Sequence, residues 1–472
     1  MDFQTVTNRQ KVALIACPLA SRNTIPLALP AIAAFVEQHG YPVTCWDLNL
    51  EFQEILHERG VPADFWNVMD WYALTPARES ILEELADEWA AVILRDAPTV
   101  VGFSVTAVST AVTLMVAKAV KRLAPAVKTV FGGPECIVSW PYFIAKKAVD
   151  FVVVGEGEQP FVELLQALDQ GRERIDIPAV VTKQSNGAAP QNAVNRDLDA
   201  LPYPAFSKMA LARYARNGRL ELPILGSVGC VQNCTFCSRH FLHGGFRCKS
   251  PQRIIDELQH NIATYGARDF LFVDSLINGK IKQLTGWTTA VIEQGLDIRW
   301  HANAILSPKN TAELLQTLRA AGCMRLWYGL ESGSSLVLKD MRKLADVARI
   351  EQNLRDTHAA GIYVTCYMFV GYPTETEVDF QASLAFLERN HASIDSILPS
   401  ICYIGEGTTL DEKQAAYGLV GGRVDWQNEN STPELRAARY AQLVAVAEDL
   451  GIVVHRRGLV DFLPMPKAQV TP

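Results

Sequence analysis

Three of the ten cysteines lie within eight residues, at Cys230, Cys234 and Cys237. Thiolates bind zinc and also iron–sulfur clusters. A closed structural zinc site needs a fourth protein ligand, for which His240 and His243 are near enough in the sequence. A four-iron cluster held by only three thiolates would instead leave one iron open to another molecule, unlike an electron-transfer cluster with four thiolates. The spacing C-x3-C-x2-C therefore predicts a metal centre and leaves both chemistries open.

The other seven cysteines are scattered, mostly within or beside apolar stretches: Cys17, Cys45, Cys136, Cys248, Cys323, Cys366 and Cys402. The N-terminal sequence MDFQTVTNRQ has neither a signal-peptide pattern nor a transit-peptide pattern, so we expect a cytoplasmic protein. Reducing conditions there keep thiols free, which argues against a disulfide framework. Each of the seven is then expected to be a small buried hydrophobic residue.

The charge balance limits the expected partners. The net charge is -7, which predicts no broad positive surface for nucleic acid or anionic lipid. The tail from residue 410 has 7 Lys and Arg against 8 Asp and Glu, which also argues against an RNA-binding appendage. The longest uncharged run, 97–117, contains Pro98 and Gly102 and divides into a strand and a helix, so we expect no membrane span.

The elements that must position a site begin with apolar strands alternating with helices. Strands are expected at 11–17, 42–46, 99–105, 128–131 and 150–154, and helices at 26–39, 79–94, 109–123, 139–147 and 158–168. This α/β pattern predicts a doubly wound parallel sheet of the Rossmann or flavodoxin-like type. Ligands of such sheets lie across the carboxyl ends of the strands, here at 18–25, 104–109, 132–135 and 155–158. Glycines in the last two segments would admit a flat ligand, or would simply form tight turns.

A second alternating series follows, with strands expected at 222–228, 269–273, 298–302, 325–330, 363–370 and 396–403. Six βα units form a partial barrel, whose active face is where the strands end, and the cysteine cluster follows the first strand. Helix starts are expected at Ser250-Pro251, Ser307-Pro308, Thr374 with Glu377, and Thr432-Pro433, the last beginning a helix to about residue 450. We place a first domain at 1–180, a linker at 181–220, the barrel at 221–409 and a mainly helical C-terminal segment at 410–472.

The cysteine loop resembles that of the radical S-adenosylmethionine (SAM) superfamily. The resemblance rests on the spacing of Cys230, Cys234 and Cys237, on the aromatic Phe236, and on the position after the first strand of a partial barrel. It implies that the three thiolates hold a [4Fe-4S] cluster whose open iron chelates the amino and carboxylate groups of SAM. It also implies that the reduced cluster cleaves SAM to a 5′-deoxyadenosyl radical, which abstracts hydrogen from the substrate. On this resemblance zinc is disfavoured.

Further matches to the family fall at later strand ends. Segment 273–278 lies where the family meets the SAM amino group, 328–333 resembles the segment near the ribose and amino acid, and 369–376 resembles the segment flanking adenine. The resemblance implies cofactor-binding roles for Phe236, Asp274, Ser275, Glu331, Ser332 and Gly371. The alternatives are that Asp274 caps a helix, that Glu331 pairs with a buried cation and that Gly371 forms a turn. No residue is assigned a catalytic role.

One departure from the family concerns the third barrel strand. Many relatives have an Arg five residues after the Trp of this strand, but Ile305 occupies that position after Trp300. His301 or Asn303 could supply polar contacts near SAM or substrate instead. For His301 a hydrogen-bonded core position is slightly favoured.

The first domain is similar to the cobalamin-binding domain fused ahead of class B radical SAM enzymes. The similarity rests on segments 46–49, 100–104, 131–134 and 154–161, so the two resemblances together cover about 11–405. It implies cobalamin contacts from Ser104, Thr106, Gly132, Gly133, Gly155 and Glu156. No Asp-x-His-x-x-Gly follows the first strand, so the resemblance implies cobalamin without an axial histidine. The alternative is a domain that keeps the fold without the corrin.

The resemblance implies a cobalamin-dependent radical SAM enzyme, with C-methyltransferase as the expected activity. Cobalamin would take a methyl group from one SAM, and methylcobalamin would deliver it to a substrate carbon activated by a second SAM. The alternatives are a non-methylating cyclisation or rearrangement, and a non-catalytic cluster or corrinoid sensor. The expected partners are a small-molecule substrate and a one-electron reductant of the flavodoxin or ferredoxin type, without nucleic acid or membrane. A methylthiotransferase is disfavoured because Cys17, Cys45 and Cys136 form no second cysteine triad.

Overall fold

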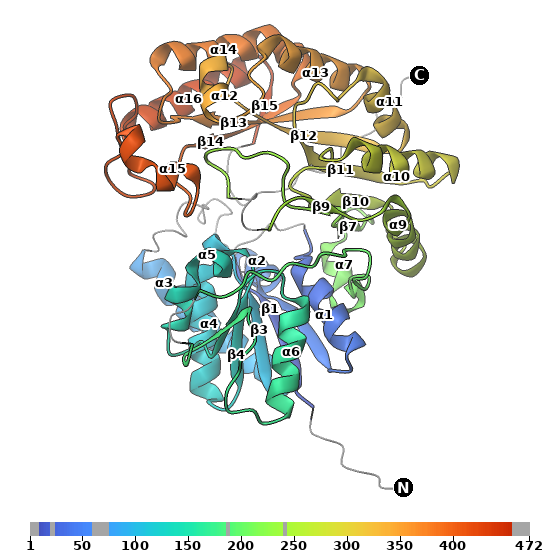
Figure 1. Cartoon of the computed structure of the whole chain (residues 1–472), viewed down its shortest axis with the longest axis vertical. Helices are drawn as coiled ribbons and strands as arrows, with labels where there is room; N and C mark the ends of the chain where they lie inside the picture. The colour runs from blue at the N-terminus through green and yellow to red at the C-terminus, as the bar shows by residue number, and fades with distance from the viewer. Residues whose placement is uncertain (1–8, 19–23, 59–74, 186–188, 239–242, 456–472) are drawn as a thin grey trace. The chain divides into compact units, whose positions relative to one another are not determined.

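The computed structural model of this 472-residue chain describes residues 9–18, 24–58, 75–185, 189–238 and 243–455 (Figure 1). The chain divides into two compact units, one ending at Gly218 and one spanning Arg219–Arg457. The break lies near the end of the expected linker, while the four-part division remains a prediction. Among the described helices, none is both long enough and apolar enough to cross a lipid bilayer.

The N-terminal unit is built on a six-stranded sheet in the order β2-β1-β3-β4-β5-β6. Neighbouring strands are parallel except β5 and β6, which are antiparallel. The strands are β1 Val12–Ala16, β2 Val43–Asp47, β3 Val100–Ser104, β4 Lys128–Gly132, β5 Phe151–Val153 and β6 Val180–Thr182. The strand order reverses around β1, which is the place where ligands of doubly wound sheets bind.

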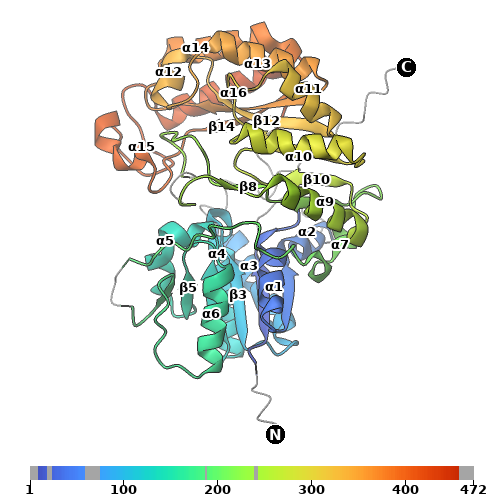
Figure 2. The same cartoon turned by 45° about the vertical axis from the view of Figure 1, so that its right-hand side comes forward.

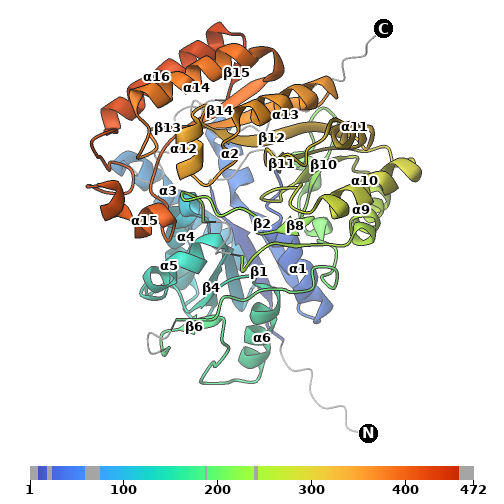
Figure 3. The ribbon, with the colours of Figure 1, turned by 45° about the horizontal axis from the view of Figure 1, so that its top comes forward.

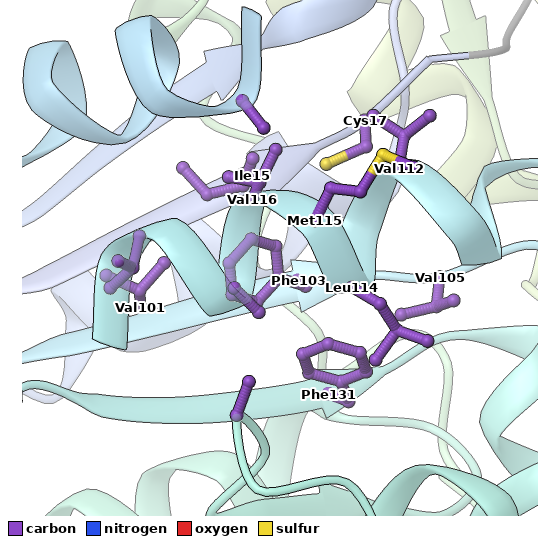
Figure 4. Packing of buried hydrophobic residues seen from close by; sticks show 14 of the residues in the cluster. Ile15, Cys17, Val101, Phe103, Val105, Val112, Leu114, Met115, Val116 and Phe131 are labelled. Carbon is purple, nitrogen blue, oxygen red and sulfur yellow. The ribbon is translucent and has the colours of Figure 1, made fainter. Parts of the chain in front are cut away.

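Helices cover both faces of this sheet. Helices α1 (Ala28–Gln38) and α6 (Glu158–Asp169) lie side by side on one face (Figure 2). The other face packs α2 (Leu48–Glu58), α3 (Pro76–Leu94), α4 (Thr110–Leu123) and α5 (Pro134–Ile144) into one apolar core. Figure 4 shows Phe103 and Phe131 of the strands beneath Val112 and Val116 of α4. The predicted doubly wound fold is confirmed.

The C-terminal unit contains a seven-stranded sheet in the order β15-β14-β13-β12-β11-β10-β7, with every neighbouring pair parallel. Its strands are β7 Glu221–Ile224, β10 Asp269–Phe272, β11 Arg299–Ala304, β12 Cys323–Glu331, β13 Tyr363–Val370, β14 Ser396–Ile401 and β15 Val453–Val454. The main helices are α9 Pro251–Tyr265, α10 Ile281–Glu293, α11 Ala312–Ala320, α13 Val347–Ala359, α14 Glu377–Asn390 and α16 Pro433–Asp449, with the short α12 Ser335–Asp340 (Figure 3). The predicted partial barrel is confirmed.

Two strand predictions differ from the structure. The single strand expected at 222–228 is divided, because the chain leaves the sheet after Ile224 and forms β8 (Ser227–Val228), which pairs antiparallel with β9 (Arg247–Cys248). The C-terminal segment is not only helical, because α16 returns the chain to the sheet and β15 pairs with β14. A two-residue strand carries almost no periodic signal, which explains why β15 was missed.

The expected helix starts have mixed outcomes. Ser250 and Thr432 cap α9 and α16 through their side-chain oxygens, as predicted. Ser307 instead accepts a hydrogen bond from Lys309 N in a turn, and α11 begins only after Thr311. The capping box of α14 joins Thr376 and Asp379 rather than Thr374 and Glu377. Helix α5 begins at Pro134, earlier than the expected residue 139, because proline fits the first helical position.

Candidate active site

The cysteine loop follows β7 and β8 and carries three free thiols. Cys234 is buried, while Cys230 and Cys237 are partly exposed. The loop also bends back on itself through Gln232, whose backbone N–H lies 3.4 Å from Cys230 Sγ and whose Oε1 lies 3.6 Å from Cys234 Sγ. The three thiols therefore come from one short loop that is already ordered around them.

Thr235 fastens this loop to three separate segments. Its N–H donates to Met341 O at 3.3 Å, beyond the end of α12, and its carbonyl accepts from Leu410 N at 3.0 Å. Its Oγ1 lies 2.7 Å from the hydroxyl of Tyr372, which follows β13. Thr235 and Tyr372 are both buried, so these hydrogen bonds are shielded from competing water. The position of the cysteines is thus set by residues more than 100 positions away.

Phe236 joins the same loop to an apolar cluster. Its ring packs against Phe369 at the end of β13, with centroids 5.1 Å apart. The cluster continues through Tyr372 to Leu410 and Trp426 of the C-terminal segment. The C-terminal segment is therefore part of the support of the cysteine loop.

Burial and charge act in opposite directions on the thiols. Burial raises the pKa of Cys234 to about 11, although the nearby Lys343 charge lowers it. Burial likewise raises the pKa of Cys230, and the Lys343 charge again opposes this. Thiols must lose their protons to bind a metal, so metal binding here would release protons.

The donor set fits an iron–sulfur cluster held by three thiolates. Cys230, Cys234 and Cys237 lie within electrostatic reach of one another. Over the described residues, no group of three or more His, Cys, Asp or Glu side chains is arranged to hold a single metal ion. His240, considered as a zinc ligand, lies outside the described residues. Soft thiolate donors suit an iron–sulfur cluster, as they also suit zinc.

At the exit of β10, Asp274 holds the backbone that leads into the cysteine loop. Its Oδ1 accepts from Gly226 N at 2.7 Å and its Oδ2 accepts from Ser227 Oγ at 2.5 Å. The side chain is buried, and burial raises the pKa of Asp274 to about 7. Ser275 is partly exposed beside it. Asp274 therefore fixes the start of the loop, while contacts of either residue with SAM remain predictions.

At the exit of β12, Glu331 forms an ion pair with Lys343. The Lys343 Nζ to Glu331 Oε1 distance is 3.1 Å, and both side chains are nearly buried. This is the buried-cation alternative considered for Glu331, and its SAM-binding role remains a prediction. Ser332 is fully buried, and its Oγ is shared between Ser383 Oγ and Ser334 N. Its predicted cofactor role is likewise untested.

At the exit of β13, Gly371 is covered by Arg436 of α16. A Cβ atom on Gly371 would lie 2.2 Å from Arg436 Cγ, so the glycine permits this close approach. Arg436 stacks over the Trp426 ring, 4.1 Å from its centroid, and donates to the carbonyls of Val424 and Trp426. One turn along α16, Arg439 pairs with the buried Glu375 at 3.1 Å. Segment 369–376, which is expected to flank adenine, therefore packs against α16 through Gly371 and Glu375.

The third barrel strand separates His301 from Asn303. His301 is buried, with Nε2 2.9 Å from Glu221 Oε2 at the start of β7, and it precedes Asn303 by two residues in the strand. Asn303 lies nearer the exits, where its Nδ2 donates to Asp274 O at 3.2 Å and its Oδ1 accepts from Tyr367 OH at 3.1 Å. Asn303, rather than His301, is positioned among the residues of the candidate site.

In the N-terminal unit, the exits of β3, β4 and β5 are adjacent because these strands are neighbours. Thr106 is exposed and Ser104 partly exposed, and Thr106 forms a capping box with Ser109. A Cβ atom on Gly132 would make only ordinary van der Waals contacts, with Val153 Cβ and O at 3.9 Å, so the protein itself does not require a glycine here. A backbone without a side chain at the β4 exit fits the close approach of a flat ligand such as a corrin ring.

The other two glycines are required by the protein itself. Gly133 has φ +100°, and a Cβ there would lie 2.7 Å from Val105 O. Gly155 has φ +97°, and a Cβ there would lie 2.4 Å from both the N and O of Ala193. Glu156 Oε2 accepts from Asn195 N at 2.6 Å. The tight-turn alternative thus accounts for Gly133 and Gly155, while their predicted cobalamin contacts remain untested.

Several residues of the site were not recognised in the sequence. They include Thr235, Lys343, Tyr372 and Arg436, which meet the cysteine loop or its neighbours only through long-range contacts. Thr235 lies inside the cysteine motif and Tyr372 directly follows Gly371, so their positions were a signal that could have been used. Lys343 and Arg436 carried no local signal.

Comparisons with known proteins agree with this geometry. The family model of the Radical SAM superfamily matches residues 224–387, and that of the B12 binding domain matches residues 20–165. The first match contains the cysteine loop and the exits of β10 to β13. The second contains the exits of β3, β4 and β5.

Curated relatives match over most of the chain. An uncharacterized methyltransferase of Pyrococcus horikoshii is 26% identical over 348 residues, which are 72% of this chain and 75% of the relative. Cytidylyl-2-hydroxyethylphosphonate methyltransferase of Streptomyces wedmorensis is 24% identical over 453 residues, 84% of this chain and 81% of the relative. Among solved structures, the radical S-adenosylmethionine methyltransferase TsrM of Kitasatospora setae, with cobalamin and a [4Fe-4S] cluster bound, has a TM-score of 0.66. That match has 17% identity and covers 90% of this chain and 81% of TsrM, which supports the fold.

Proposed function

This chain belongs to the radical SAM enzymes that carry a B12-binding domain, and we propose that it methylates a carbon atom of a small-molecule substrate. The observation that carries the proposal is the cysteine loop, which offers three thiols at the strand ends of a barrel in a chain that also matches a B12-binding domain. Two relatives named as methyltransferases align with about three quarters or more of their own length.

The cofactors are a [4Fe-4S] cluster, SAM and cobalamin, and we propose a position for each. Cys230, Cys234 and Cys237 would hold the cluster, and the residues around Glu331 and Gly371 would receive SAM. When bound, the reduced cluster supplies the electron that cleaves SAM, and cobalamin carries the methyl group. The chain keeps the cysteine loop in place through Thr235 and shields it through Phe236 and Phe369.

The N-terminal unit would bind cobalamin at the exits of β3, β4 and β5. Gly132 has no side chain to block the approach of a ligand there, and Ser104 and Thr106 offer hydroxyl groups to the polar substituents of a corrin. None of the four exit segments, 18–25, 104–109, 132–135 and 155–158, contains a histidine. Within the exits the chain would therefore place no imidazole on the cobalt.

Radical SAM chemistry requires an electron donor and a substrate. The donor in our proposal is a one-electron carrier of the flavodoxin or ferredoxin type, in the cytoplasm. The substrate is a small molecule with an unactivated carbon atom.

The test follows two products of SAM, so it does not need the substrate to be known. The full chain is reconstituted anaerobically with iron, sulfide and hydroxocobalamin, and is incubated with reductant and SAM. We expect S-adenosylhomocysteine, which reports methyl donation, and 5′-deoxyadenosine, which reports radical cleavage. Cys234→Ala should abolish 5′-deoxyadenosine, since it removes a cluster ligand.

The same products separate the alternatives. Formation of 5′-deoxyadenosine without S-adenosylhomocysteine would support a cyclisation or rearrangement instead of methylation. Binding of cluster and corrin without either product would support a sensor. Loss of all corrin absorbance with an intact cluster would contradict the methyl-transfer mechanism while leaving the radical assignment in place.

A further inference from the structure

Lys343 lies next to the cysteine loop, and both line a small cavity. A cavity of about 10 Å³ is lined by Gln232 of the loop, by Gly329 and by Lys343, together with apolar residues of the barrel. The Lys343 ammonium also lies 6.0 Å from the centre of the Phe236 ring. Gln232 and Phe236 flank Cys234 on both sides, so the cation is next to the ligand loop.

The backbone is strained on both sides of this cation. Glu331 has φ +69° and Arg342 has φ +59°, and these are two of the four non-glycine residues with positive φ in the described chain. The pairing of β12 with β13 shifts register between Gly329 and Glu331, which turns Glu331 toward Lys343. Such conformations cost free energy and persist where the surrounding structure enforces them, frequently at functional sites.

Gly329 makes room for the pair. A Cβ atom at this position would lie 2.7 Å from both Glu331 Oε1 and Lys343 Nζ. The ion pair therefore lies directly over the backbone of Gly329, and any other residue would displace one of its members. Three local features thus accompany the ion pair of Lys343. They are the absent side chain of Gly329, the register shift between β12 and β13, and the positive φ angles of Glu331 and Arg342.

Lys343 remains charged despite its burial. Only 11% of its side chain is exposed. Its Nζ lies 3.1 Å from Glu331 Oε1, and this carboxylate stabilises the charged form of the ammonium. A buried charge is weakly screened, so it acts on the thiolates beside it more strongly than a surface lysine would.

We infer that Lys343 is a positioning residue that raises the reduction potential of the cluster held by the three cysteines, and that Glu331 opposes it. A cluster that accepts one electron from the external donor gains one negative charge. A fixed positive charge beside the ligand loop stabilises the reduced state, and a negative charge destabilises it. The inference rests on the proposed ligation of a cluster by Cys230, Cys234 and Cys237, and it requires neither SAM nor substrate.

The same unit contains a second buried Lys–Glu ion pair, whose lysine is not among the charges that act on Cys230 or Cys234. Lys249 Nζ lies 2.5 Å from Glu257 Oε2, and both side chains are buried. The charge of Lys249 acts on Asp274. If each Lys–Glu pair contributed only a buried ion pair to the fold, neutralising either pair would change the cluster potential by the same amount.

The experiment measures the midpoint potential of the cluster in the full chain, reconstituted with iron and sulfide and titrated with redox mediators without SAM. In Lys343→Met, the reduced-to-oxidised ratio at the wild-type midpoint should fall about tenfold, which for one electron is about 59 mV. Glu331→Gln should shift the ratio in the opposite direction. Lys343→Met/Glu331→Gln and Lys249→Met/Glu257→Gln should both stay within about threefold of the wild type. Lys343→Arg should keep the wild-type ratio of reduced to oxidised cluster, because the positive charge is retained.

Iron content and thermal unfolding are measured beside the potential. An unchanged potential in Lys343→Met with full iron content would overturn the inference, even if the variant were less stable. If Lys343→Met failed to fold, Glu331→Gln would decide, because an unchanged or lower potential there contradicts the inference. A shift of equal size in the Lys249 double variant would also overturn it. Failure of the wild-type chain to assemble any cluster would instead contradict the ligand assignment on which the inference rests.

Discussion

The two parallel sheets of this protein prepare their strand ends in opposite ways. In the N-terminal unit the exits of β4 and β5 carry glycines, and at Gly132 a Cβ atom would make only ordinary contacts. In the barrel unit the exits carry charged and polar side chains that are fixed by partners, such as Asp274 on Gly226 and Glu331 on Lys343. The strand ends of the N-terminal sheet are therefore shaped by glycines, and those of the barrel sheet by side chains that partners hold in place. This difference suits a large flat cofactor in the first unit and a small charged cofactor in the second.

The largest effect is expected at Gly133. Gly133→Ala forces a Cβ atom to 2.7 Å from Val105 O at φ +100°, a conformation that is essentially restricted to glycine. We expect the free energy of unfolding to fall by about 3 kcal/mol or more, measured by urea denaturation. Corrin binding would then be lost together with the fold.

Gly132→Ala is the matched control for this prediction, because its Cβ would meet only an ordinary contact at 3.9 Å. We expect its unfolding free energy to change by less than about 1 kcal/mol, while hydroxocobalamin binding weakens at least several-fold. If Gly132→Ala binds hydroxocobalamin as well as the wild type, the β4 exit is not a ligand site. The contrast between the two sheets would then be one of turn geometry alone.

These glycines also show how far the sequence could lead. The alternation of short apolar runs with helical segments predicted both sheets, since each of these patterns is local. Spacing alone placed the three cysteines, and residue type drew attention to Gly132 and Gly133. The sequence could not show that a side chain at position 133 would clash with Val105 O while one at position 132 would not. That difference depends on which backbone atoms the fold places next to each glycine.

The supports of the cysteine loop were hidden for a related reason. Thr235 and Tyr372 are 137 positions apart, and no local pattern indicates that their hydroxyls meet. Lys343 follows α12 without any local signal of a functional role, whereas the structure places it beside Glu331 with 11% of its side chain exposed. The role of the C-terminal segment was missed because its anchor, the two-residue β15, is too short to be recognised.

The second prediction uses Asp47, the last residue of β2 in the N-terminal sheet. Its Oδ2 accepts from Tyr214 OH at 2.6 Å, where Tyr214 ends the short helix α7 (Leu211–Tyr214). Burial raises the pKa of Asp47 to about 6, despite this hydrogen bond, from a usual value near 3.9. The folded state therefore binds the Asp47 proton more tightly than the unfolded state does.

The sign of the pH dependence follows from this difference. The stabilising contribution of protonated Asp47 is complete below about pH 4 and is lost as the pH rises through about 6. Relative to Asp47→Asn, the wild-type chain should lose about 2 kcal/mol of unfolding free energy over this range, after allowance for partial exposure. Urea titrations of both proteins at pH 4 to 7 measure the difference. A pH-independent difference would mean that Asp47 titrates normally and that burial does not act on this carboxyl group.

The smallest effect on stability is expected at Tyr372, whose hydroxyl group is hydrogen-bonded to Thr235 of the cysteine loop. Tyr372→Phe removes the 2.7 Å hydrogen bond to Thr235 and leaves the Thr235 hydroxyl buried without that partner, which should cost about 1 kcal/mol. Tyr417→Phe is the control, because its hydroxyl bonds are long, 3.5 Å to Tyr372 and 3.4 Å to Asp340. We expect Tyr372→Phe, but not Tyr417→Phe, to lower the iron retained per chain after anaerobic reconstitution and gel filtration. The small stability change makes iron retention informative, because a variant that stays folded can lose iron only through the position of the loop. Equal retention in both variants would show that Thr235 is held well enough by Met341 and Leu410, and that the barrel exits depend less on side-chain partners than the comparison implies.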